Sequence, residues 1–128
     1  MKLTCCTWGM PTLSADEALD CIARLGYDGV QLTLSDARPF ATELTRLDAA
    51  ERLRIGRLLD DCGLELPSVS GHTNLMAREP DARKRAMSRL KLMVDACLDL
   101  ARPEGVPSLN TLVGGGEGEW EARKTELV

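Results

Sequence analysis

The feature that most constrains the fold is an alternation of strand-like and helix-like segments along the 128 residues. Short runs rich in apolar or alternating residues are each followed by a longer segment with helical periodicity. The strand-like runs lie at 2–8, 29–34, 64–70 and 108–113, and the helical segments lie at 14–26, 48–62, 80–101 and 119–128. Each strand–helix unit takes about 30 residues, and such short connections favour parallel strands joined by right-handed crossovers.

This β-α-β-α-β-α-β-α order predicts an α/β fold with a parallel sheet. Two architectures satisfy it. One is a small doubly wound sheet, and the other is the first four β/α units of a (β/α)8 barrel, whose complete form needs about 250 residues. The last helical segment reaches Val128 without a cap or a polar tail. We therefore expect a single partial barrel domain over residues 1–128, a half barrel truncated in or after its fourth helix.

Local signals support the helical segments. Ser14 and Glu17 have the spacing of a capping box, Asp48 and Glu51 repeat it, and Pro80 takes a first-turn position. The third helical segment is expected to bury one apolar face. The residues expected on that face are Ala86, Leu90, Met93, Val94, Cys97, Leu98 and Ala101.

Charge and hydropathy indicate which partners the protein binds and in which compartment it is found. The net charge of −4 opposes a nucleic-acid groove that relies on positive field. No apolar run reaches the roughly 18 residues of a membrane span, and the first residues lack the apolar region and cleavage site of a signal peptide. We expect a cytoplasmic protein that binds neither nucleic acid nor membranes.

Five cysteines and one histidine form neither a zinc framework nor a disulfide scaffold. We expect reduced thiols that pack as small apolar side chains. Cys5 and Cys6 are adjacent in the first strand, so they should point to opposite sides of the sheet. Because the carboxylates concentrate on helical segments rather than at strand ends, we expect no metal site in this chain.

The candidate site residues lie at or near the carboxyl ends of the predicted strands, where parallel folds place their chemistry. His72 follows the third strand, and Trp8 ends the first. Gln31 lies on the polar side of the second strand, and Asn74 follows His72 by two positions. Each of these residues also has a purely structural interpretation. His72 would hydrogen-bond to the backbone of its loop, and Trp8 would fill space in the core. Gln31 would lie on a polar strand face, and Asn74 would stabilise a turn.

A sequence resemblance sharpens this interpretation. Leu25-Gly-Tyr-Asp-Gly-Val-Gln-Leu32 resembles the G-[YF]-D-G-[VI]-E-L signature of the xylose isomerase-like barrel superfamily. That superfamily includes sugar phosphate isomerases/epimerases, inosose dehydratases and endonuclease IV-type enzymes. Trp8-Gly-Met-Pro11, Cys62–Leu66 and Ser70-Gly-His72 follow the same order. The resemblance covers the first half of the barrel, with Gln31 where the signature has Glu.

The resemblance implies an N-terminal fragment of a divalent-metal-dependent sugar or sugar phosphate isomerase/epimerase, inactive on its own. Relatives hold Mn, Mg, Co or Zn with Glu, Asp and His from strands five to eight, so the metal is expected only in a full-length relative. His72 is implied to contact substrate hydroxyls and assist proton movement, which makes it our catalytic candidate. Trp8, Gln31 and Asn74 are our candidates for binding a sugar or polyol.

Two other functions stay open. A half barrel exposes two strand edges and an inner face, so the chain would suit a non-catalytic α/β module that self-associates or docks on a partner. An endonuclease IV-type DNA-repair fragment is a further alternative. That branch needs histidines after both the third and the fourth strands for its zinc cluster, and this chain offers only His72.

Overall fold

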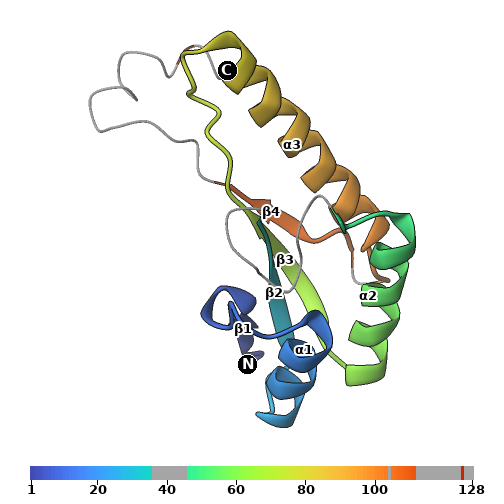
Figure 1. The fold of residues 1–128 in the computed structure, drawn as a ribbon. Helices are drawn as coiled ribbons and strands as arrows, with labels where there is room; N and C mark the ends of the chain where they lie inside the picture. The colour runs from blue at the N-terminus through green and yellow to red at the C-terminus, as the bar shows by residue number, and fades with distance from the viewer. Residues whose placement is uncertain (36–45, 104, 112–124, 126–128) are drawn as a thin grey trace.

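The computed structural model describes residues 1–35, 46–103, 105–111 and 125. Its four described strands form one parallel sheet in the order β1-β2-β3-β4 (Figure 1). The elements are β1 (Thr4–Cys6), the 3-10 helix η1 (Thr7–Gly9), α1 (Ala15–Arg24), β2 (Gly29–Leu34), α2 (Ala49–Cys62), β3 (Glu65–Gly71), α3 (Pro80–Asp99) and β4 (Ser108–Asn110). The predicted α/β fold is confirmed, as an open sheet with interleaved helices. The helical segment predicted at 119–128 lies outside the described residues, apart from residue 125.

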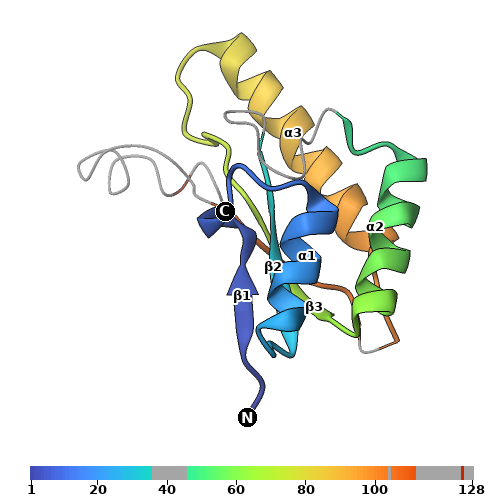
Figure 2. The same cartoon turned by 60° about the horizontal axis from the view of Figure 1, so that its bottom comes forward.

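The helices α1, α2 and α3 cover one face of the sheet (Figure 2). Strand register shows which side chains face them: Cys5 pairs with Val30, and Leu32 pairs with Val69, which pairs with Leu109. These residues pack in or against the core. The opposite face, which we call the inner face, carries Thr4, Cys6, Gln31, Thr33, Ser68, Ser70, Ser108 and Asn110. Cys5 and Cys6 therefore point to opposite faces, as the sequence predicted.

One irregularity in β3 determines which of its residues face the helices and which lie on the inner face. The β2–β3 register shifts between Gly29, which pairs with Glu65, and Gln31, which pairs with Ser68. Leu66 and Val69 are both buried although they are three residues apart, which strict alternation of a strand does not allow. β3 therefore holds an extra residue at Pro67, a bulge at a position where a missing N–H can be tolerated.

Helix α3 departs from the sequence expectation. Its buried residues are Ala86, Met93, Ala96 and Cys97, followed by the C-cap residue Leu100. Val94, Leu98 and Ala101 are exposed, the first two by 42% and 57%, so their predicted place on the buried face was wrong. Val94 and Leu98 each directly follow a buried residue, and consecutive helical side chains point about 100° apart. Ala101 lies beyond the end of α3 and its C-cap residue Leu100.

The helix starts follow the predicted capping logic. The Ser14 hydroxyl accepts from the backbone N–H of Glu17, whose carboxylate accepts from the N–H of Ser14. Asp48 accepts from the backbone N–H of Glu51 at 2.8 Å. Helix α3 uses a cap that the sequence analysis missed: the Glu79 carboxylate accepts from two backbone N–H groups of the first turn. These two donors lower the pKa of Glu79 below its usual 4.5.

The turn from α1 into β2 joins three strands. Gly26 takes a left-handed conformation, with φ of 81°, which ends the helix. The Asp28 carboxylate accepts from the N–H of Leu3 at 2.7 Å, and the Asp28 N–H donates to the Leu3 carbonyl at 2.9 Å. The Asp28 carbonyl accepts from the N–H of Glu65 at 3.0 Å. Asp28 thus links the start of β2 to the chain entering β1 and to the first residue of β3.

Gly29 completes this junction because β3 approaches it closely. A Cβ at Gly29 would lie 2.9 Å from the backbone carbonyl oxygen of Glu65. We predict that Gly29→Ala lowers the free energy of unfolding by about 1–3 kcal/mol, since the backbone of β3 would have to shift. Urea denaturation followed by circular dichroism measures this loss. Gly9→Ala is the matched control, because no atom lies within 4 Å of its added Cβ. Equal losses in the two variants would contradict the prediction.

Candidate functional site

The carboxyl edge of the sheet brings two predicted site residues into contact. His72 directly follows β3, and Trp8 lies in η1 directly after β1. Their ring centroids are 5.3 Å apart with an interplanar angle of 70°, an edge-to-face contact. Because β2 lies between β1 and β3 in the sheet, the two rings meet across the end of β2.

A buried hydroxyl positions Trp8. Thr7, the residue before it, is only 3% exposed, and its Oγ1 accepts from the backbone N–H of Thr33 at 2.9 Å. The Thr7 carbonyl also accepts from the N–H of Met10, which closes the short helical turn. This anchoring fixes η1 against β2, so the indole is held beside His72 while 48% of Trp8 remains exposed.

His72 keeps one nitrogen unpaired. The residue is half-buried, and its Nδ1 is buried without a hydrogen-bond partner among the described residues. A buried polar atom in this state costs about 1–3 kcal/mol, and functional sites are among the places where such atoms are kept. Among the described residues, this buried nitrogen therefore has an unused donor or acceptor position.

Gln31 lies lower on the inner face, away from the carboxyl edge. It is the third residue of β2 and pairs in register with Cys6 and Ser68. Its Nε2 donates to the Ser68 hydroxyl at 2.9 Å. The predicted polar side of β2 is confirmed, and Gln31 has a partner that the sequence analysis missed.

Asn74 serves a turn in the loop after β3. Its Oδ1 accepts from the N–H of Met76 at 3.1 Å, and its carbonyl accepts from the N–H of Ala77 at 3.3 Å. This is the structural alternative considered for Asn74. The structure therefore brings Trp8 and His72 into contact and places Gln31 below them on the inner face. The Asn74 side chain hydrogen-bonds within its own turn.

Ser68 and Ser70 are inner-face residues that sequence reasoning did not single out. They precede His72 at spacings of two along the strand, so all three fall on the same side of β3. This alternation of Ser68, Ser70 and His72 with Val69 and Gly71 was the signal that could have identified them. Together they form a polar column that runs up to the carboxyl edge.

The inner face contains a hollow of about 230 Å³. Its lining residues are Thr4, Cys5, Cys6, Gln31, Pro67 and Ser68. Nearby, the Cys6 thiol lies 3.6 Å from the hydroxyl of Thr33. The hollow therefore adjoins the bulge of β3 and the hydrogen bond between Gln31 and Ser68.

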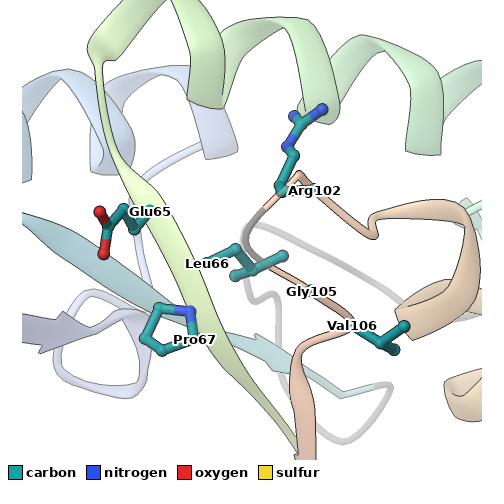
Figure 3. Close-up of a pocket in the computed structure, with 6 residues that line it drawn as sticks. All are labelled: Glu65, Leu66, Pro67, Arg102, Gly105 and Val106. Atoms are coloured by element: carbon teal, nitrogen blue, oxygen red, sulfur yellow. The ribbon is translucent and has the colours of Figure 1, made fainter.

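A different hollow, of about 210 Å³, lies beside the start of β3 and the chain that enters β4 (Figure 3). It is lined by Glu65, Leu66, Pro67, Arg102, Gly105 and Val106. Arg102 extends toward α2, where it donates to the Gly56 carbonyl and pairs with Asp60 at 3.4 Å. Since its guanidinium is engaged in holding α2, this hollow carries no chemistry comparable to the carboxyl edge.

The model of the xylose isomerase-like TIM barrel family matches residues 19–123. The chain belongs to this family. The match includes Gln31, His72 and Asn74, and Trp8 precedes it. A search of curated proteins gave no match.

The described residues do not fit a divalent-metal site. None of their His, Cys, Asp and Glu side chains gather in a group of three that could hold an ion. The cysteines are free thiols, and burial raises the pKa of Cys62 and Cys97, which disfavours the thiolate that binds metal.

Within the residues that the structure describes, no helix has the length and apolar character needed to cross a membrane.

The contact between Trp8 and His72 predicts a specific spectroscopic change. Trp8→Leu removes the indole ring current, so the ring resonances of the single histidine should shift in ¹H–¹³C spectra. Loss of the aromatic pair should also lower the free energy of unfolding by about 0.5–1.5 kcal/mol. Gly9→Ala, which keeps the indole, should leave the His72 resonances in place. Unchanged His72 resonances in Trp8→Leu would contradict the contact.

Proposed function

We propose that this chain supplies a substrate-binding wall of a sugar or polyol isomerase/epimerase. The observation that supports this most directly is the pair of Trp8 and His72 at the carboxyl edge of the sheet. That edge is where parallel α/β folds, and barrels in particular, bind their substrates. The half-exposed indole offers an aromatic platform for the apolar C–H face of a sugar ring.

His72 supplies the proton chemistry in this proposal. Isomerisation and epimerisation move a proton at a carbon next to a carbonyl or hydroxyl group, and an imidazole is suited to accept and return it near neutral pH. The position of His72 at the carboxyl edge of the sheet favours it over the cysteines for this role. A Mn, Mg, Co or Zn ion is expected only in a full-length relative, and the described residues of this chain offer no group of three side chains that could hold one.

This function predicts that sugars and polyols bind next to the single histidine. Titration with aldoses, ketoses and polyols should shift the His72 ring resonances and quench Trp8 fluorescence, measured in a Trp120→Phe background. His72→Gln should weaken binding about fivefold, since it removes one hydrogen-bonding ring. No response of either probe to any sugar or polyol would contradict the proposal.

Asn74→Ser is the matched control for this titration. A serine can still accept from the backbone in the same turn, so the loop is kept while the carboxamide is lost. If Asn74 serves the turn alone, binding should stay within twofold of the unaltered chain. A larger loss of binding in a folded Asn74→Ser variant would show that Asn74 binds the substrate, as the sequence analysis predicted.

The open sheet supports a second candidate, a non-catalytic module that self-associates. Within the described residues, β1 and β4 each pair with one neighbour, which leaves two strand edges with free backbone groups. We predict a molar mass above that of the 14.0 kDa monomer, rising with concentration, in light scattering after size-exclusion chromatography. Thr4→Lys places a charge on the β1 edge and should shift the equilibrium toward monomer. A monomer at all concentrations would exclude this candidate.

A further inference from the structure

We infer that Met93 is a positioning residue for His72 and acts through the backbone of Gly71. The inference rests on the proposed function, in which His72 lines the substrate site, and it identifies what holds that imidazole against Trp8. Gly71 is the last residue of β3, and His72 directly follows it. The position of the imidazole therefore depends on where the backbone of Gly71 is held.

Met93 lies directly against Gly71 on the helix side of the sheet. Gly71 follows Val69 by two positions along β3, so both residues face the helices. A Cβ added to Gly71 would lie 2.4 Å from Sδ of Met93, 3.0 Å from its Cε and 3.1 Å from its Cγ. Of the described glycines, Gly71 has the shortest such distance. The thioether therefore occupies the place where any larger residue at this position would put its Cβ.

Met93 has little freedom to move away from this contact. It lies on α3, is fully buried and belongs to the hydrophobic core. A methionine side chain is flexible on its own, but a close-packed interior leaves it little empty space to enter. Since the last three heavy atoms of the side chain all crowd the added Cβ, a small rotation of its tip would not relieve the contact. An added methyl group would instead push the end of β3 away from α3.

Both aromatic rings are positioned relative to the end of β2. The Thr7 hydroxyl accepts from the backbone N–H of Thr33, which fixes the turn that carries the indole. Gly71 pairs in register with Leu34, the next residue of β2. This pairing restrains Gly71 within the sheet, whereas Met93 restrains it perpendicular to the sheet. Movement of Gly71 away from α3 would therefore change the distance between the imidazole and the indole.

The test measures the effect of Trp8 on His72 without any ligand. In the unaltered chain, Trp8→Leu should move the ring resonances of His72 in ¹H–¹³C spectra, since it removes the indole ring current. In a Gly71→Ala background, the same substitution should move these resonances less than half as far. An equal movement in the two backgrounds overturns the inference.

A size exchange between the two contacting residues separates positioning from general damage to the fold. Adding Met93→Ala to Gly71→Ala vacates the space that the new methyl group needs. The full effect of Trp8→Leu on the His72 resonances should then return. A folded double variant in which this effect stays reduced overturns the inference.

Met93→Ala alone, with Leu59→Ala as its matched control, decides the question if the Gly71 variants do not fold. Leu59 is an equally buried core residue in the last turn of α2, close to the start of β3. Both variants should be destabilised in urea denaturation, because each leaves a cavity. Only Met93→Ala should reduce the effect of Trp8→Leu on the His72 resonances. Equal effects in the two variants overturn the inference.

A ligand titration distinguishes failure of this inference from failure of the proposed function. Xylitol should bind about fivefold more weakly to Gly71→Ala, and to the double variant within twofold of its affinity for the unaltered chain. Full affinity of a folded Gly71→Ala chain overturns the inference. If His72 responds to no sugar or polyol in any of these chains, the proposed function is contradicted, and the ligand-free resonances still decide the role of Met93.

Discussion

The hydrogen bonds of Asp28 hold the amino-terminal end of the sheet together. They tie the start of β2 to Leu3 on one side and to Glu65 on the other, so three strands leave this junction in a fixed order and register. Trp8 and His72 lie at the far ends of two of these strands. Their contact is therefore a consequence of alignment set at the opposite edge, with Thr7 adding a local anchor.

This junction also explains what the family signature encodes. Gly26 ends a helix, Asp28 joins strands, and Gly29 admits the backbone of β3. None of these roles touches the carboxyl edge where the candidate site lies. A match to this motif therefore reports the architecture of a barrel wall, and barrels of one architecture support many reactions. The chemistry has to be argued from Trp8, His72 and the inner face.

Sequence reasoning predicted the alternation of elements because helix caps and apolar periodicity are local signals. It placed Trp8 and His72 at one edge because parallel strands end together. It missed the Ser68 partner of Gln31, since that pairing depends on register across two strands. It also assigned Val94 and Leu98 to the core, because several apolar stripes on α3 satisfy helical spacing and only tertiary packing selects one.

The bulge at Pro67 sets the phase of β3. Before it, Leu66 faces the helices, and after it Val69 does, which leaves Ser68, Ser70 and His72 on the inner face. Removing the extra residue at Pro67 would restore regular alternation and keep Val69 on the helix side, whereas removing one residue after the bulge would carry His72 toward the core. After the bulge, insertions and deletions in β3 therefore preserve the facing of Ser68, Ser70 and His72 only in steps of two. Over evolutionary time, the length of this strand should be guarded more strictly than the identity of most of its residues.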